Sequence, residues 1–99
     1  MIILENGFVK RGDEKKCYLV HESGQLEYDV DESVDLQKVN QVYWSDSSNK
    51  HEIDIYTNNG KIYSWFYDDT KQVIEDYSIL KSMLEVTYEN EIRVRGFLC

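Results

Sequence analysis

The 99-residue chain contains no proline and no alanine. Because alanine is the best helix former, its absence beside plentiful Val, Ile, Tyr, Trp and Phe favours strands. No hydrophobic run approaches the length of a membrane span. The apolar start at Met1 to Leu4 is followed at once by Glu5 and Asn6, so no signal peptide is predicted. We therefore expect a cytoplasmic protein without membrane contact.

Cysteine, histidine and glycine are scarce. The cysteines are Cys17, in a strand-like run, and Cys99. A bridge between them is possible, but two free thiols of a cytosolic protein are favoured. His21 and His51 have no metal-ligand spacing, and the five glycines form no phosphate-binding loop. With no catalytic set in view, we expect no enzymatic activity, no metal and no cofactor.

Positive charge is also scarce. The chain has 11 Lys and Arg against 19 Asp and Glu, which gives a net charge of −8. This balance argues against direct nucleic-acid binding, which requires a basic surface. Acidity serves solubility, and it also suits a basic protein partner.

Apolar residues alternate with polar ones along most of the chain, which predicts a small antiparallel sheet. Leu26, Tyr28 and Val30 alternate with Glu27 and Asp29, as in a half-buried strand. The predicted strands are 2–9 with a bulge at Gly7, 17–20, 26–30, 39–44, the two arms of a hairpin at 51–67, and a short last strand at 92–95.

The period changes after residue 69. Asp69 is a suitable N-cap, and Gln72 completes a capping-box-like pair. The sequence therefore predicts an amphipathic helix over 70–85. Its predicted buried stripe is Val73, Ile74, Tyr77, Leu80 and Leu84.

The expected fold class is α+β: a strongly bent antiparallel sheet of six to seven short strands with one helix near the C-terminus. The order strand, hairpin and capped helix from Val39 to Leu84 resembles the last part of a pleckstrin-homology-like barrel. That resemblance implies a helix that closes one end of a barrel. The fold hosts many functions, so it implies none.

The hairpin at 51–67 allows two registers. A two-residue Asn59-Gly60 loop sets Ile55 opposite Ser64, and this register separates apolar from polar residues better, so we prefer it. A three-residue loop with Gly60 in a left-handed bulge would instead set Tyr63 and Trp65 beside Ile53 and Ile55.

In the preferred register, one hairpin face carries Glu52, Asp54 and four aromatic rings. The rings, predicted to bind a partner, are Tyr56, Tyr63, Trp65 and Tyr67. The alternative is a second small core, in which other strands cover these rings.

Acidic residues 22–35 form the second candidate site, where Asp29, Asp31, Glu32 and Asp35 are predicted to bind a partner. The alternative is a solvated loop. The spacing resembles the start of a calcium loop, yet Val34 and Asn40 replace the required Gly and Glu, so no calcium site is predicted.

These features indicate a binding protein. The Lys-, Asn-, Ile- and Tyr-rich composition is typical of an AT-rich genome, such as a low-GC bacterium or its phages. We expect a phage or mobile-element inhibitor that docks on a nucleic-acid-handling host protein. The alternatives are a structural protein that self-associates and a module that binds a small ligand or peptide. A second copy of the chain, in a homodimer, is a further candidate partner.

Overall fold

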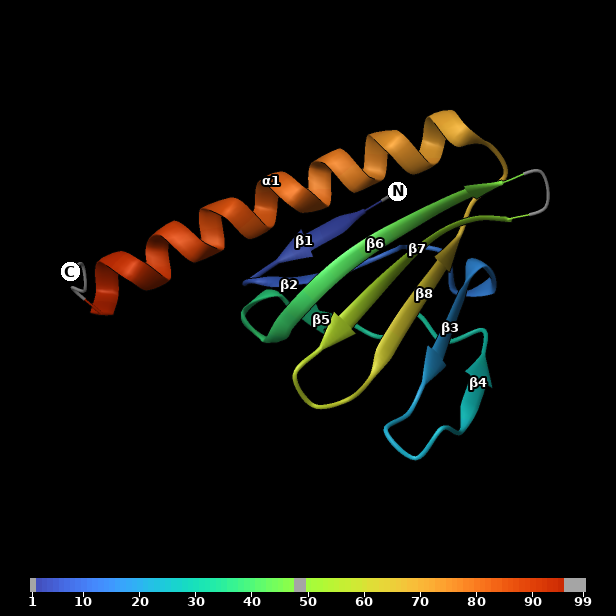
Figure 1. Cartoon of the computed structure of the whole chain (residues 1–99), viewed down its shortest axis with the longest axis horizontal. Helices are drawn as coiled ribbons and strands as arrows, with labels where there is room; N and C mark the ends of the chain where they lie inside the picture. The colour runs from blue at the N-terminus through green and yellow to red at the C-terminus, as the bar shows by residue number, and fades with distance from the viewer. Residues whose placement is uncertain (1, 48–49, 96–99) are drawn as a thin grey trace.

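The computed structural model describes residues 2–47 and 50–95, with side chains for 2–45 and 50–85. Figure 1 shows one long helix beside a curved set of strands, which confirms the α+β class. The elements are β1 (Ile3–Glu5), β2 (Phe8–Lys10), the 3-10 turn η1 (Glu14–Lys16), β3 (Cys17–Val20), β4 (Leu26–Tyr28), β5 (Val34–Asp35), the 3-10 turn η2 (Leu36–Lys38), β6 (Val39–Ser47), β7 (Lys50–Thr57), β8 (Ile62–Phe66) and α1 (Thr70–Arg95).

The strands form two antiparallel sheets. The larger sheet has the order β4-β3-β8-β7-β6, and the smaller has the order β1-β2-β5. No described strand joins the two sheets by a ladder, so the closed barrel implied by the resemblance is not seen.

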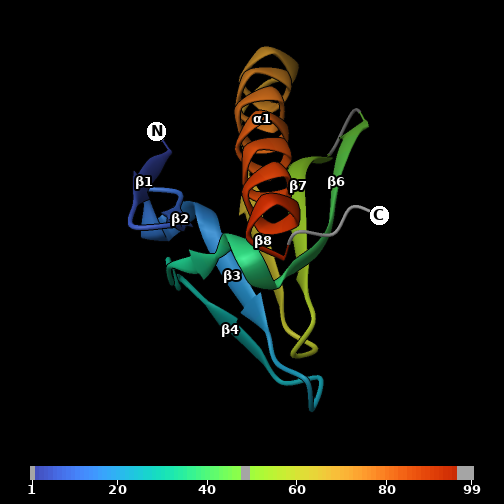
Figure 2. The same ribbon diagram turned by 90° about the vertical axis from the view of Figure 1, so that its left-hand side faces the viewer.

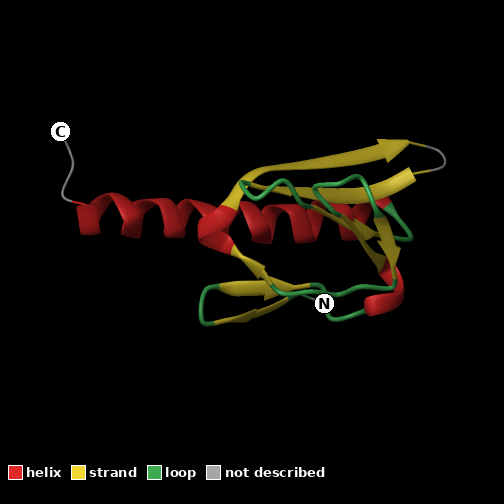
Figure 3. Cartoon of the chain, turned by 90° about the horizontal axis from the view of Figure 1, so that it is seen from below, coloured by secondary structure: helices red, strands yellow, loops and turns green. Residues whose placement is uncertain are grey.

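The core lies on one face of the five-stranded sheet. In Figures 2 and 3, α1 lies between the β1–β2 hairpin and the long strands β6 and β7. Helix and small sheet therefore cover the same face together. Buried side chains from all these elements meet there: Val9, Cys17, Leu19, Val34, Leu36, Ile53, Ile55, Tyr63, Trp65, Tyr67, Val73 and Leu80.

The β7–β8 hairpin adopts the register that we did not prefer. Ile55 pairs with Tyr63, and Ile53 pairs with Trp65. The loop has three residues, since the Thr57 amide donates to the Lys61 carbonyl at 3.1 Å. Gly60 takes the left-handed conformation at φ +82°, as the last residue of such loops does. This one-residue slip sends Tyr63 and Trp65 to the core face.

The N-terminal strand is also a hairpin, because Gly7 is not a bulge. Asn6 and Gly7 have φ values of +53° and +82°, which is the signature of a two-residue type I′ turn. Glu5 consequently pairs with Phe8, and residues 2–9 divide between β1 and β2.

Helix α1 begins as predicted and ends much later. The Gln72 amide donates to the Asp69 carboxylate at 2.9 Å, which confirms the N-cap. Val73 and Leu80 are buried, but Ile74 of the predicted stripe is 47% exposed. The helix continues to Arg95, so the predicted strand at 92–95 is wrong. Figure 1 shows its C-terminal part extending past the sheets.

Strand β4 is shorter and more exposed than its pattern predicted. It ends at Tyr28, and Val30 lies after it. Leu26 and Tyr28 are 40% and 70% exposed, so the half-buried interpretation is wrong for both. The reason is position, because β4 is an outer strand and these two side chains lie on the face away from the helix.

Candidate binding face

The five-stranded sheet has a second face that the helix and the small sheet do not cover. Side chains alternate along each strand, so the neighbours of the buried Leu19, Ile53 and Trp65 lie on this second face, here called the open face. From β4 to β6 its residues are Leu26, Tyr28, Tyr18, Val20, Ile62, Ser64, Phe66, Glu52, Asp54, Tyr56, Gln41, Tyr43 and Ser45.

Aromatic rings gather in two groups on the open face. On one side, the ring of Tyr18 lies 4.7 Å from that of Phe66 and 5.9 Å from that of Tyr28. On the other side, Tyr43 and Tyr56 make an edge-to-face pair at 5.4 Å. Tyr28, Tyr43 and Tyr56 are all exposed. Exposed aromatic rings held by their neighbours are typical of protein-binding surfaces.

A pair of carboxyl groups lies between the two ring groups. Glu52 pairs across the sheet with Phe66, and Asp54 lies between Tyr43 and Ser64. Only 2% of Glu52 is exposed. The Ser64 hydroxyl donates to Asp54 at 2.7 Å, and the ammonium of Lys50 is 3.7 Å from Glu52. An acidic pair is thus surrounded by rings on a surface that is otherwise open.

The environment of Glu52 favours its protonated form. Burial raises the pKa of Glu52 to about 7, and the hydrogen bond and charge of Asp54 act in the same direction. Lys50 opposes these effects, but its side chain is 55% exposed and only partly offsets them. Near neutral pH Glu52 is therefore partly protonated, and the approach of a cation would favour release of its proton.

The predicted aromatic patch is divided between the two faces of the sheet. Tyr56 lies on the open face, whereas Tyr63, Trp65 and Tyr67 belong to the core, with Trp65 only 1% exposed. The predicted exposure of Trp65 is wrong, because the hairpin slips by one residue. These three rings are buried, as in the alternative, but they belong to the same core cluster as Ile53 and Ile55 and do not form a second small core.

The acidic segment mostly serves the chain itself. Asp31 accepts from the backbone amides of Arg11 and Gly12 at 2.9 and 2.8 Å, and Asp35 accepts from the amide of Gln37 at 3.0 Å. Asp29 is exposed, with a φ of +57°. Partner binding by Asp29, Asp31, Glu32 and Asp35 stays a prediction.

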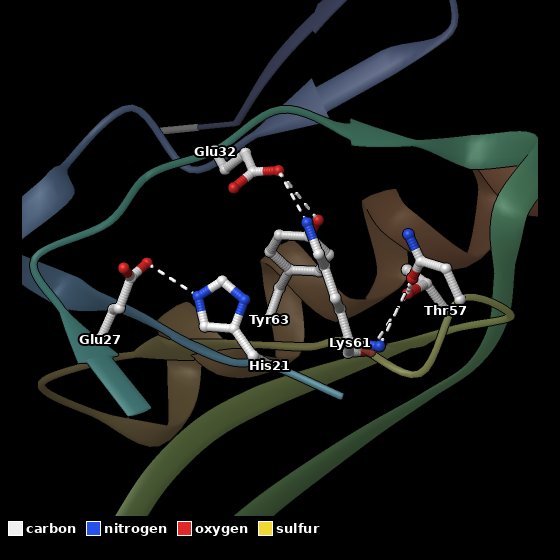
Figure 4. Close-up of polar contacts among 7 residues, drawn as sticks. His21, Glu27, Glu32, Thr57, Lys61 and Tyr63 are labelled. Carbon is white, nitrogen blue, oxygen red and sulfur yellow. Dashed lines mark hydrogen bonds and ion pairs between the residues drawn. The ribbon is translucent and has the colours of Figure 1, made fainter. Parts of the chain in front are cut away.

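Glu32 borders a polar cleft of about 190 Å³ between β5 and the β7–β8 turn. Figure 4 shows one oxygen of its carboxylate contacting two groups, the Tyr63 hydroxyl, which donates at 3.3 Å, and the ammonium of Lys61 at 3.7 Å. Burial and the Glu32 charge raise the pKa of Tyr63 to about 12, so this phenol stays neutral. Nearby, His21 lies 3.0 Å from Glu27. Each of these polar side chains contacts a neighbouring side chain, and the contacts do not prepare any of them as a nucleophile or a general base.

Cys17 is a structural residue. It is 3% exposed, and burial raises the pKa of its thiol to about 12. The thiol donates to the Asp13 carbonyl at 3.3 Å. The neighbouring Arg11 guanidinium lies 3.8 Å from the centre of the Tyr67 ring and donates to the Phe66 carbonyl at 2.6 Å. A neutral thiol beside a structural arginine is unreactive.

Three comparisons, with protein-family models, curated proteins and solved structures, find no match for this chain. Within the described residues, no cluster of three or more His, Cys, Asp or Glu side chains could hold a metal ion. Across the same described part, no helix has the length and apolar character needed to cross a membrane.

From the alternation along one strand, sequence analysis placed Glu52, Asp54 and Tyr56 on one face of the hairpin, and it named Tyr56 as a candidate site residue. Tyr18, Tyr28, Tyr43 and Phe66 join them only through the strand order, which no local pattern reveals.

Proposed function

We propose that this chain is a non-enzymatic binding protein whose open face docks on a basic protein partner. The observation that carries the proposal is the nearly buried Glu52 beside Asp54, bordered by rings on an uncovered sheet face. Burying charge is costly unless it is paired, and Lys50 supplies only a distant, exposed partner at 3.7 Å. A cationic side chain from a partner would complete the arrangement.

Arginine suits this arrangement better than lysine. Its planar guanidinium can bond two carboxylate oxygens and stack on tyrosine or phenylalanine rings at the same time. Glu52 and Asp54 would supply the carboxylates, and Tyr43, Tyr56 and Phe66 the rings. The net charge of −8 would steer a basic partner toward the chain and repel phosphate.

Surfaces rich in arginine are what nucleic-acid-binding proteins present to their ligand. We therefore propose a nucleic-acid-handling protein as the partner class. Occupying its basic surface would inhibit it, as expected for a phage or mobile-element inhibitor.

Titration calorimetry with a hexa-arginine peptide tests this proposal, with a hexa-citrulline peptide as the neutral isostere. We expect the arginine peptide to bind and the citrulline peptide to fail. The variant Glu52→Gln/Asp54→Asn should lose binding. The matched control Glu75→Gln/Glu85→Gln replaces two carboxyl groups by amides at exposed helix positions and should retain binding.

If both double variants lost binding of the arginine peptide equally, binding would depend on the overall charge of the chain and not on Glu52 and Asp54. If the native chain did not bind the peptide, the proposal would be contradicted outright.

A further inference from the structure

Strand β6 is an outer strand of the five-stranded sheet and is nine residues long. It pairs with β7 on one side only, and in the described part of the chain no strand pairs with its other side. Figure 2 shows β6 at the outer margin, with α1 on its inner side. Alternate residues of β6 consequently direct backbone N–H and C=O groups away from the sheet.

From Gln41 to Ser47 this edge lacks the features that usually prevent strand pairing. Proteins protect long edges with proline, lysine, inward charges or bulges. Strand β6 has no Lys, Arg or Pro, and its register is continuous from Gln41 to Ser47, with a single irregularity between Val39 and Gln41. The opposite edge, β4, is only three residues long.

Aromatic rings are exposed on both sides of the same edge. Tyr43 lies on the open face and is 49% exposed, and Trp44 lies on the helix side and is 41% exposed. The ring of Trp44 lies 6.1 Å from that of Tyr77 in a tilted arrangement. A strand added beside β6 would cover both rings through cross-strand contacts.

Room exists for such a strand on the helix side. A groove of about 230 Å³ runs between the start of β6 and α1, and Val42, Tyr77 and Leu84 supply its apolar lining. Side chains of an added strand that point toward the helix would enter this groove.

We propose that β6 pairs antiparallel with β6 of a second copy of this chain. Two identical antiparallel strands are complementary to themselves about a two-fold axis, so one surface serves both copies. Charge permits a second copy at this place. The chain carries a net charge of −8, yet Asp46 is the single charged residue of β6, so this strand itself contributes little repulsion between two copies.

The register that pairs all of 39–47 is centred on Tyr43. Tyr43 then faces Tyr43 of the second copy, and Asp46 faces Asn40, so like charges are not opposed. Trp44 lies opposite Val42 of the second copy. The two five-stranded sheets become continuous, and both open faces stay uncovered.

Light scattering after gel filtration, over a dilution series, should give a mass of twice 11.8 kDa that falls toward the monomer value on dilution. Disulfide trapping in a Cys99→Ser background then locates the interface. Tyr43→Cys should cross-link, because facing Cα atoms of antiparallel strands lie about 4.5–5.5 Å apart.

Two matched controls should not cross-link. Gln41→Cys lies on the same strand, about 13 Å from its equivalent in the second copy, and Tyr28→Cys lies on the other edge of the sheet. Because Tyr43→Cys could itself weaken pairing, hydrogen exchange of the unchanged chain gives a second measurement. Outward amides of β6 should gain protection with concentration, whereas those of β4 should not.

A monomeric mass at every concentration overturns the proposal. So does a yield of cross-linked dimer for Tyr28→Cys or Gln41→Cys that equals the yield for Tyr43→Cys. Either result leaves peptide binding at Glu52 and Asp54 untouched.

Discussion

Ile53 lies directly opposite Trp65 across β7 and β8, and the two side chains are 0% and 1% exposed. This pair defines which face of the sheet is core. With Ile53 and Trp65 inward, Glu52 and Phe66 must face outward together. The register therefore sets Phe66 and Ser64, in place of Tyr67 and Trp65, opposite Glu52 and Asp54 on the open face.

Trp65→Ala should lower the free energy of unfolding by about 3–5 kcal/mol, because it removes a large buried ring and leaves a cavity. Urea denaturation measures this change. In a Trp44→Phe background, acrylamide should quench the remaining Trp65 fluorescence poorly until the protein unfolds. Efficient quenching of the native protein would place Trp65 at the surface and refute the register.

Leu80→Ala should cost about 2–5 kcal/mol of stability, since Leu80 is 1% exposed and packs between helix and sheet. Ile74→Ala, on the same helix but 47% exposed, is the matched control and should cost far less. Urea unfolding of both variants tests the orientation of α1, and equal losses would mean that the helix is rotated from the position described.

The raised pKa of Glu52 predicts a specific pH dependence of stability. Its pKa rises from 4.5 to about 7 on folding, so the folded state holds this proton more tightly than the unfolded state. Stability from this group is present below the unfolded pKa and is lost as pH rises through the folded pKa. The melting temperature should therefore decrease as the pH is raised from 4.5 to about 7.

Glu52→Gln removes that titration, so its melting temperature relative to the native chain should increase as pH rises through the same range. A constant difference between the two proteins across it would show that Glu52 titrates normally.

Cys17 should resist thiol reagents in the folded protein. Its burial and its pKa of about 12 leave little thiolate near neutral pH. In a Cys99→Ser variant, reaction with a disulfide reagent should be slow and should accelerate in urea. Rapid labelling without denaturant would contradict the buried position.

The sequence predicted those elements whose signals are local. The alternation at 17–20 and the Asp69 cap correctly predicted β3 and the start of α1. The two turns were predicted wrongly because two local solutions were nearly equivalent at each of them. Asn6-Gly7 and Asn59-Gly60 share the same turn residues, yet the first forms a two-residue loop and the second ends a three-residue loop.

The candidate site was less predictable than the fold. The hairpin register depends on how Trp65 and Tyr63 pack against α1 and the small sheet, which is a tertiary effect. Tyr28 and Tyr43 come from opposite edges of the sheet and share a face only because β3, β8 and β7 lie between them. No local pattern carries such long-range order.

The most direct test of the proposed binding face is NMR titration of ¹⁵N-labelled protein with the hexa-arginine peptide. We expect saturable shift changes that concentrate on the amides of Glu52, Asp54, Ser64 and Phe66 and extend to Tyr43. The hexa-citrulline peptide should leave these signals unchanged. Saturable changes centred on residues 29–35, or small changes spread over all acidic residues, would contradict binding by the open face.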